Sequence, residues 1–424
     1  MNTYDKLLSD QTFNIEFNGY LTNHVKHAII ALQKIDAPPS MLQKYWDLYT
    51  DTTPYGLSIE NVPEAWDKVI PSTEEEWKET RGMKVKWQNY CIFLKNQLEE
   101  RFDNNVSALV AHYAPDVIPG MVGALTHGII HAGWALDAFS SSPGGEKKET
   151  SVVGPWMVIE GLAYLNFSFV SVHPEGFKHG AIKEDSVMDS LLRIGTQFHE
   201  EHLAESWIAR AKATYDKESG FHTELIPAGF QWEVSKVLAH QHPVAYNLPT
   251  WLDTKPIDVV LKDLYKAATV IYLTTLDEKD GHGNFVVLHL LSSLWGLEHV
   301  LTTIENDDVS RSSLKAFYVA MICLLSSSAA GFPHHAALQS TIQTHFESND
   351  DDDMYDKEID KVEKNEWMKT VERAYDEIEE HNIKLVYVTR ELWRRYNHLK
   401  AFRLAGEAFT LTPNIGPKDP EFDA

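Results

Sequence analysis

Apolar residues recur along most of the chain at intervals of three and four positions. This 3.6-residue period predicts amphipathic α-helices, and the strictly alternating pattern of strands is scarce. Proline and glycine between the periodic segments, as at Pro119-Gly120, mark the expected turns. The pattern therefore predicts an all-α protein. The clearest helical stripes are Val25, Ile29 and Leu32, then Trp87, Cys91 and Leu94, and finally Leu385, Val388 and Leu392.

Two polar segments interrupt the helical pattern. Residues 140–150 are rich in Ser, Gly, Lys and Glu, and residues 349–361 include the acidic run Asp350–Asp353, whose self-repulsion opposes burial. The acidic run lacks the glycine and the terminal glutamate of a calcium-binding loop. We expect both segments to be surface loops, because the helical segments on either side then share one core. The sequence thus predicts a single large helical domain, residues 1–424, with long connecting loops.

Composition narrows the classes of function. The formal net charge of −24 argues against simple electrostatic binding to nucleic acid or to an anionic membrane. Residues 157–172 and 316–330 are the longest apolar runs, and polar residues interrupt both, so buried helices are expected rather than membrane spans. Cys91 and Cys323 lack the spacing of a disulfide framework or a thiolate zinc site. No signal peptide pattern opens the chain, and a cytoplasmic protein is predicted.

Four histidine-bearing segments lie in apolar, helix-like runs that are far apart in the sequence. An imidazole on an apolar helix face needs partners for its nitrogens, so several such faces predict convergence on a shared metal ion. Taken alone, His24 at a helix start is more typical of a structural or exposed histidine. His289 lies in a run that is apolar nearly all round, where hydrogen bonds to serines or a carbonyl are an equal alternative. The four histidines are His24, His127, His289 and His381.

The segment around His127 is rich in small residues. Gly123, Gly128 and Gly133 cost helix propensity, and a helix keeps such residues where another group must approach its backbone closely. A structural role in which His131 bonds a carbonyl is as well supported as a functional one. Helical spacing predicts one stripe made of Ala124, His127, His131 and Trp134.

Other histidines are secondary candidates. His27 points about one residue aside from His24, and His299 follows His289 at a spacing close to the same face. The run His199–His202 lacks the HExxH spacing that places both imidazoles on one helix face, so a charged surface is expected there. Histidines beside prolines or turns are weaker candidates for lining a pocket mouth: His240, His242, His334 and His335.

The C-terminal stripe contains an unusual pair. It runs from Ile378 through His381 to Leu392, and Lys384 lies one turn after His381. A lysine on a half-buried helix ordinarily extends its ammonium group to solvent, and the residues alone favour that interpretation. Beside a metal the ammonium form is disfavoured, and the neutral amine can react with carbon dioxide to give an anionic carbamate ligand.

An ordered set of motifs resembles one known family. The motifs are Phe17-Asn18-Gly19-Tyr20-Leu21-Thr22-Asn23-His24, Ala37-Pro38-Pro39, Thr53-Pro54-Tyr55-Gly56, His127-Gly128-Ile129-Ile130-His131 and His381-Asn382-Ile383-Lys384-Leu385. Together they resemble the questin oxidase-like family over about residues 14–411. That family includes fungal enzymes that oxidatively open anthraquinone rings, described as Baeyer–Villiger-type oxygenases or as non-haem iron dioxygenases. In its iron-dependent members, four histidines and a carboxylated lysine hold the metal.

The resemblance implies a ligand set in this chain. It favours His24 over His27 and His127 over His131, and the region around His289 matches the family pattern least well. The Asn-His motif falls on His24, the His-x-Ile-Ile motif on His127, the later helical histidine on His289, and the His-x-Ile-Lys motif on His381 and Lys384.

Four imidazoles and one oxygen anion suit Fe(II) better than calcium or magnesium, with zinc as the alternative metal. The predicted function is a non-haem iron oxygenase that uses O2 for oxidative carbon–carbon cleavage. Its substrate is expected to be a small aromatic, quinone, hydroquinone-like or polyketide-like molecule. Residues expected to orient the rings are Asn23, Thr126 and Asn382. Aromatic residues expected to wall a flat substrate pocket are Trp134, Tyr246 and Trp251.

Three other functions fit the same residues. A zinc-dependent hydrolase would use metal-bound hydroxide to attack an ester or a lactone. A non-catalytic helical binding protein would keep the histidines as hydrogen-bonded core residues. An NADPH-dependent Baeyer–Villiger reaction is the third, although the chain has no dinucleotide fingerprint, Walker loop or GxSxG motif to support it.

Overall fold

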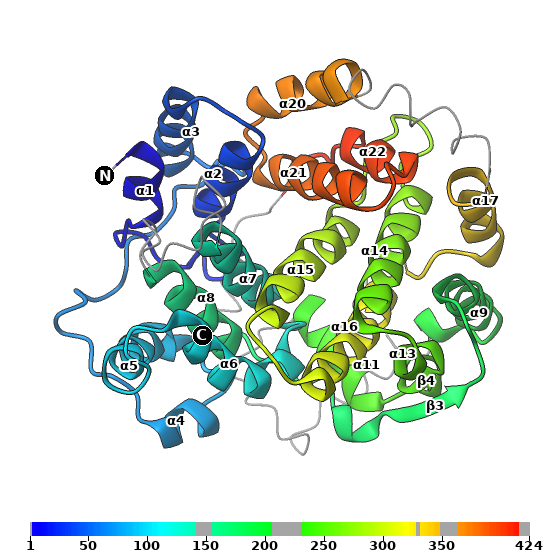
Figure 1. Cartoon of the computed structure of the whole chain (residues 1–424), viewed down its shortest axis with the longest axis horizontal. Helices are drawn as coiled ribbons and strands as arrows, with labels where there is room; N and C mark the ends of the chain where they lie inside the picture. Colours follow the sequence, from blue (N-terminus) through cyan, green and yellow to red (C-terminus); the bar gives the residue numbers. More distant parts are fainter. Residues whose placement is uncertain (1, 141–154, 206–229, 328–330, 348–362, 415–424) are drawn as a thin grey trace.

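The computed structural model describes residues 2–140, 155–205, 230–327, 331–347 and 363–414. Within these residues the chain is mainly helical, which confirms the all-α prediction (Figure 1). The helices are α1 (Thr3–Leu8), α2 (Val25–Lys34), α3 (Pro39–Asp51), α4 (Glu74–Glu79), α5 (Trp87–Glu100), α6 (Val106–Val117), α7 (His127–Ser140), α8 (Trp156–Phe167), α9 (Val187–Glu200), α11 (Phe230–His240), α12 (Pro243–Tyr246), α13 (Trp251–Thr254), α14 (Ile257–Thr274), α15 (Phe285–Leu301), α16 (Asp307–Ser327), α17 (His335–His345), α20 (Met368–Tyr375), α21 (Glu380–Arg395) and α22 (Lys400–Glu407).

The predicted surface loops fall on residues that the structure does not describe. Ser140 ends α7, whereas residues 141–150 and 349–361 lie outside the described ranges. The extent of the domain, residues 1–424, stays a prediction.

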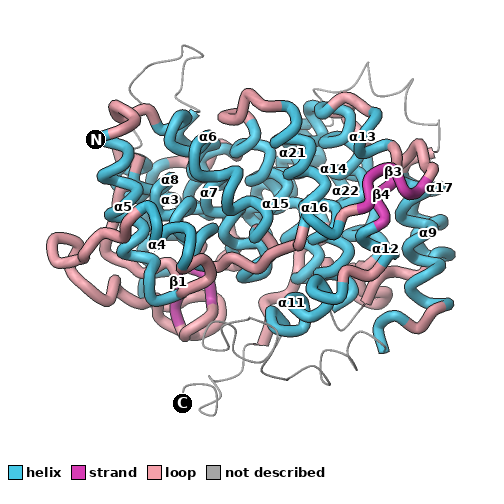
Figure 2. Tube along the Cα trace, turned by 90° about the horizontal axis from the view of Figure 1, so that it is seen from below, coloured by secondary structure: helices cyan, strands magenta, loops and turns pink. Residues whose placement is uncertain are grey.

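Strand structure in the described ranges consists of two small sheets. An antiparallel pair, β1 (Glu16–Phe17) and β2 (Leu21–Thr22), folds the segment that leads into α2. A parallel pair, β3 (Lys178–Ile182) and β4 (Asn247–Pro249), lies at the edge of the helical body beside α9 and α13 (Figure 2).

The predicted helical stripes are buried. Leu32 on α2, Cys91 on α5 and Leu392 on α21 are 1% exposed or less. The C-terminal stripe, however, begins later than predicted, because the Glu379 side chain accepts a hydrogen bond from the His381 backbone N–H and caps α21 there. Ile378 precedes this cap and is 48% exposed, so its inclusion in the stripe was wrong.

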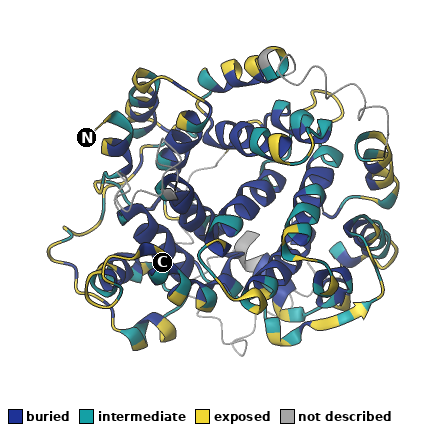
Figure 3. Cartoon of the chain, in the orientation of Figure 1, coloured by how far each residue is buried: buried dark blue, intermediate teal, exposed yellow. Residues whose placement is uncertain are grey.

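Helices α7, α8 and α15 form the centre of the molecule, with their backbones in close contact (Figure 3). A Cβ atom added to Gly133 of α7 would lie 1.9 Å from the carbonyl oxygen of Gly296 in α15. A Cβ added to Gly128 would lie 2.6 Å from the Cα of Leu165 in α8. Larger residues at these positions would force the helices apart, which confirms the expected role of these glycines.

One described helix, α16, is long and apolar enough to cross a membrane by length and composition. However, 83% of its most apolar window is buried inside the fold. Such burial is the pattern of a core helix, as the sequence predicts for this run.

Four helices place the functional residues. α2 packs against α7 and α21, and α15 packs against the same two helices. Figure 1 shows α2, α7, α15 and α21 next to one another, with α14, α16 and α22 on the other side of α15. Segments from the two ends and the middle of the chain therefore meet in one bundle.

Candidate metal centre

Four histidines predicted as metal ligands meet at one point. The ring centroids form a closed circuit, with 4.7 Å from His24 to His127, 4.9 Å from His127 to His289, 4.7 Å from His289 to His381 and 4.8 Å from His381 to His24. One nitrogen of each ring lies within 4.8 Å of one nitrogen of every other. We call these residues the four-histidine cluster. Its members lie near the N-termini of α2, α7, α15 and α21, respectively.

A partner on the Nδ1 side orients three of the rings. His381 Nδ1 lies 2.6 Å from the Glu379 carboxylate, and His289 Nδ1 lies 2.8 Å from the Phe285 carbonyl oxygen. The Nδ1 atom of His127 contacts the carbonyl oxygen of Ala124. Because these partners accept hydrogen bonds, each Nδ1 carries the hydrogen and the Nε2 lone pair is left free. These contacts fix both the tautomer and the ring direction, as in metal-bound histidines.

The Nε2 atoms have no donor to satisfy them. His127 Nε2 and His289 Nε2 face each other at 3.2 Å, and the Nε2 atoms of His24 and His381 have no hydrogen-bond partner. Because the hydrogen of each neutral ring is on Nδ1, the Nε2 lone pairs of His127 and His289 point at each other. This contact is repulsive unless a cation lies between the two nitrogens. The donor set therefore fits a metal ion that accepts a lone pair from each imidazole.

Electrostatics keep these rings neutral. Burial, with the Lys384 charge next in effect, lowers the pKa of His289 to about 3. Burial is also the main cause that lowers the pKa values of His24, His127 and His381 well below the ordinary value. Three of the four rings lie in or beside the first turn of a helix, where the positive end of the helix dipole also disfavours imidazolium. A metal would therefore meet ligands that are already deprotonated.

An unusual backbone turn precedes His127. Ala124, Leu125 and Thr126 all adopt positive φ angles of 50°, 52° and 66°, the left-handed region that side chains with a Cβ rarely occupy. The turn brings the Ala124 carbonyl to His127 Nδ1 and starts α7 at His127. Ala124 therefore does not belong to the helical stripe that the sequence predicts. Strain of this kind persists where surrounding contacts hold it, and it is common at functional sites.

Lys384 lies one turn after His381 and is fully buried. Its Nζ atom has no hydrogen-bond partner, so the expected extension to solvent does not occur. Burial lowers the Lys384 pKa to about 7, against the opposing effect of Glu380 and Glu379. A substantial fraction of this amine is therefore uncharged at neutral pH.

Sequence reasoning missed an acidic pair beside the cluster. Glu379 and Glu380 are 1% and 0% exposed, and the Tyr55 hydroxyl donates to Glu380 at 2.9 Å. Burial is the largest cause that raises the pKa of both carboxyls, and for Glu380 the neighbouring Glu379 charge comes next. Both acids come just before His381 in the sequence, and Tyr55 belongs to the motif Thr53-Pro54-Tyr55-Gly56. The position of the two acids next to a candidate ligand could have indicated their place in the site.

His27 and His131 lie beside the cluster rather than in it. His27 Nδ1 is 3.0 Å from His24 Nδ1, and the His27 and His131 ring centroids are 4.1 Å apart. Both residues are buried. The structure thus brings these secondary candidates next to His24.

The residues expected to orient the rings bond the backbone instead. Asn23 accepts from the Val25 N–H and donates to the Asn14 carbonyl, so it serves the start of α2. Thr126 bonds the preceding carbonyl, and Asn382 exchanges hydrogen bonds with Thr410. Short polar side chains compete well for adjacent backbone groups, and this preference decides their role here.

Three further histidines lie away from the cluster. His299 Nε2 is 3.6 Å from Asp137, in a separate buried network, and His242 caps the short helix α12 by accepting from the Val244 N–H. His199 Nε2 bonds the Phe332 carbonyl, and among the described residues none of these three belongs to a cluster of potential metal ligands. Each has a hydrogen-bonding role in the fold.

The aromatic residues expected to wall a substrate pocket are packed in the core. Trp134, Tyr246 and Trp251 are each 1% exposed or less. Trp134 donates to the Ser292 carbonyl, and Tyr246 bonds two backbone carbonyls. Phe285, in contrast, places its ring 4.6 Å from His381 and 5.0 Å from His289 and so forms an apolar wall of the cluster.

Comparison with known proteins places the chain in one family. No curated protein matches the sequence. The family model described as questin oxidase-like matches residues 21–389, which include all five predicted ligand positions and most of the 424 residues. This family name implies oxidase or oxygenase chemistry on a small molecule. The chain belongs to the questin oxidase-like family.

Proposed function

We propose that the protein is a metal-dependent oxygenase. In this proposal one Fe(II) ion is bound by His24, His127, His289, His381 and the carbamate of Lys384. The enzyme then uses O2 for oxidative carbon–carbon cleavage of an aromatic, quinone or hydroquinone-like molecule. The observation that carries the proposal is the convergence of four buried imidazoles, with one ring nitrogen of each within 4.8 Å of one ring nitrogen of every other.

The donor set supports a transition metal. Neutral imidazoles bind iron, zinc and copper well, whereas calcium and magnesium prefer oxygen ligands. Five protein donors leave one position of an octahedron for a small ligand. Fe(II), when bound, would supply the one-electron chemistry that makes O2 reactive toward an electron-rich carbon.

Lys384 supplies the anionic donor in this proposal. A neutral amine attacks the carbon of CO2, and the product releases one proton to give a carbamate. Lys384 fits this reaction because its Nζ is buried, lacks a partner and has a pKa of about 7. The N-termini of α2, α7 and α21 meet at the cluster, and a negative carbamate is favoured where positive helix ends converge.

The surrounding side chains hold the site in one geometry and exclude water. Glu379 accepts from His381, the Phe285 carbonyl accepts from His289, and the Phe285 ring covers one side. The Glu379–Glu380 pair keeps a proton to a higher pH than an ordinary carboxyl, because two adjacent buried charges repel each other. Tyr55 links this pair to the cluster through its hydroxyl group.

We also keep the predicted cellular setting as a proposal. Cys91 and Cys323 are free and buried, and burial raises the pKa of both thiols. Two free, unreactive thiols fit the reducing cytoplasm.

Metal analysis and oxygen uptake test the function. The protein is purified without oxygen, loaded with Fe(II) and given a panel of anthraquinones and hydroquinones. We expect one iron in the four-histidine cluster and substrate-dependent O2 consumption. Bound zinc with ester or lactone hydrolysis and no O2 uptake would instead establish the hydrolase alternative. A strict requirement for NADPH would point to the Baeyer–Villiger alternative.

The carbamate has its own test. Protein equilibrated with ¹³C-labelled bicarbonate is expected to show a carbamate signal by ¹³C NMR, and the Lys384→Met variant is expected to lose it. Lys315→Met is the matched control, because Lys315 is also buried but is paired with Asp253. A signal that persists in Lys384→Met would rule out Lys384 as its source.

A further inference from the structure

A second group of imidazoles lies against the four-histidine cluster. His24, His27 and His131 are 1%, 0% and 5% exposed, and one nitrogen of each lies within 4.8 Å of one nitrogen of the others. His24 belongs to both groups. In the described part of the chain its Nε2 has no hydrogen-bond partner, and its Nδ1 lies 3.0 Å from His27 Nδ1. We call the second group the three-histidine cluster.

Unpaired nitrogens mark the three-histidine cluster as unusual. His27 Nε2 and His131 Nε2 are buried and have no hydrogen-bond partner within the ranges that the structure describes. Leaving such a group unsatisfied costs about 1–3 kcal/mol, and most buried polar groups avoid that cost. The 3.0 Å between the Nδ1 atoms of His24 and His27 suits a hydrogen bond and equally suits two adjacent ligands of one metal ion. A hydrogen bond between His24 and His27 would use the Nδ1 atom of each ring. It would not explain why the Nε2 atoms of His27 and His131 are buried without partners.

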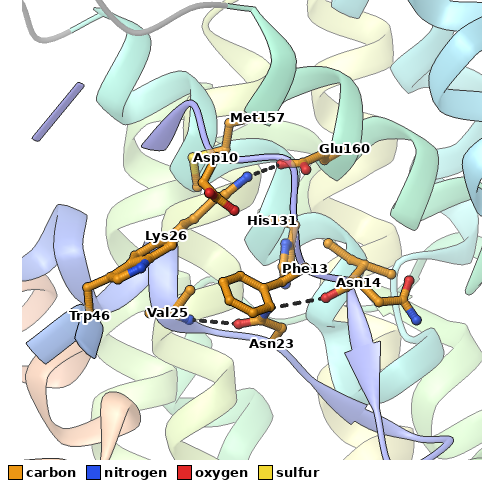
Figure 4. Close-up of a pocket in the computed structure, with 11 residues that line it drawn as sticks. Asp10, Phe13, Asn14, Asn23, Val25, Lys26, Trp46, His131, Met157 and Glu160 are labelled. Atoms are coloured by element: carbon orange, nitrogen blue, oxygen red, sulfur yellow. Dashed lines mark hydrogen bonds and ion pairs between the residues drawn. The ribbon is translucent and has the colours of Figure 1, made fainter. Parts of the chain in front are cut away.

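A small cavity connects this cluster to polar groups near the surface. The cavity of about 20 Å³ is lined by His131, and the Lys26–Glu160 ion pair and Asp10 lie at its wall (Figure 4). A space of this size holds one water molecule. The Lys26 ammonium is bound 2.7 Å from Glu160, so its charge is neutralised beside the cavity. The cavity reaches the cluster at His131 and has room there for a water ligand.

We propose that His24, His27 and His131 bind a second divalent transition metal, of the class of Zn²⁺ or Cu²⁺, with His24 bridging the two metal sites. One ring nitrogen from each histidine and one water from the cavity would complete four-coordination, the ligand number that zinc prefers with three imidazoles. Bridging requires that His24 release its remaining ring proton to solvent, because both of its nitrogens then bind metal. This site goes beyond the proposed function, which needs only the four-histidine cluster.

Metal stoichiometry of the full-length chain tests the second site. The protein is saturated with Zn²⁺, freed of excess metal by desalting and analysed by elemental mass spectrometry. Two equivalents per chain are expected. His131→Gln keeps most of the side-chain volume and is expected to lose one equivalent, while His289→Gln loses the other. His24→Gln is expected to weaken both, and His299→Gln is the control that keeps both.

Two outcomes separate this inference from the proposed function. A wild-type protein that saturates at one equivalent, retained in His131→Gln, would overturn the second site. One equivalent that disappears in His131→Gln but stays in His289→Gln would support the second site and remove the four-histidine cluster as a metal centre. If a variant folds poorly by circular dichroism, Co²⁺ titration of the wild type followed by visible absorption decides between one and two binding steps.

Discussion

The same four helices build two buried polar centres that behave in opposite ways. Near their N-termini, the helices α2, α7, α15 and α21 supply the four-histidine cluster. About ten residues further along, which is about 15 Å in a helix, they supply a network of polar side chains around Asp137. We call this second centre the Asp137 network. Its carboxylate accepts from Lys34 at 2.6 Å, Tyr387 at 2.6 Å and Trp295 at 3.1 Å, with His299 at 3.6 Å.

The difference lies in the balance of donors and acceptors. In the Asp137 network one acceptor group meets several donors, so the polar groups satisfy one another. In the four-histidine cluster two Nε2 atoms face each other and two have no hydrogen-bond partner among the described residues, an arrangement that suits a cation. Burial of a histidine therefore does not distinguish a metal site from a structural network. The distinction lies in whether each ring nitrogen has a hydrogen-bonding partner or points an unused lone pair at its neighbours.

The largest expected effect comes from removing one ligand. His289→Ala is expected to abolish bound metal and turnover, because even the loss of a residue that only supports a ligand costs about 10–100-fold. His299→Ala is the control on the same helix, and it should keep metal and activity while lowering stability. Metal content and O2 uptake measure both variants. Equal metal loss in the two variants would erase the distinction between the two centres.

The second expected effect is on stability. Asp137→Ala removes the buried carboxylate to which the buried Tyr387 and Trp295 donate, and leaving a buried donor unsatisfied typically costs about 1–3 kcal/mol. Asp137→Asn keeps hydrogen-bond acceptors and should lose less. Urea unfolding measures the change, and metal content should stay at the wild-type value. An Asp137→Ala protein of normal stability that loses its metal would show that this network serves the metal site.

Acid should act on one centre before the other. The folded-state pKa of His289 is about 3, below its ordinary value of 6.5, so the neutral ring stabilises the fold fully above pH 6.5 and progressively less as pH falls toward 3. At pH 5 His289 alone should reduce the unfolding free energy of the metal-free protein by about 2 kcal/mol. Burial opposes ionisation of Asp137, but His299 and Lys34 together keep its pKa below the ordinary value, so this carboxylate stays charged at pH 5.

Urea unfolding at pH 8 and pH 5 measures this dependence, with and without metal. Bound metal should protect the cluster, because it competes with protons for the same lone pairs. Equal stability of the metal-free protein at the two pH values would contradict the neutral, unprotonated cluster.

Sequence reasoning predicted the helices, and the four histidines that it singled out come together in the structure, but it missed much of what surrounds them. Periodicity is a local property, so α2, α5 and α21 were predictable, and the order of motifs pointed to His24 and Lys384. The left-handed turn at Ala124–Thr126 was not predictable, because tertiary contacts override local preference there. The place of His299 was also hidden, since Asp137 lies far away in the sequence and the two meet only when α15 packs on α7.

Glu379 gives the smallest and most specific test. Its carboxylate lies 2.6 Å from His381 Nδ1 and makes the ring a better electron donor to a metal. Burial raises the pKa of both Glu379 and Glu380, and the Glu379 charge raises that of Glu380 further, so the pair holds a proton to a higher pH than ordinary carboxyls do. Glu379→Gln keeps an oxygen that accepts the same hydrogen bond and removes only the charge. Metal affinity, measured by competition with a chelating dye, should fall by about tenfold, or about 1.4 kcal/mol.

Glu377→Gln is the matched control two residues away. Glu377 bonds the backbone of Ile378 and the amide of Asn382, and its carboxylate is not a partner of His381 Nδ1. Its variant should bind metal with wild-type affinity. An equal loss of metal affinity in both variants would mean that any negative charge near the N-terminus of α21 has this effect, and not the Glu379 carboxylate in particular. An unchanged affinity in Glu379→Gln would mean that ring orientation alone, and not the negative charge, prepares His381 for the metal.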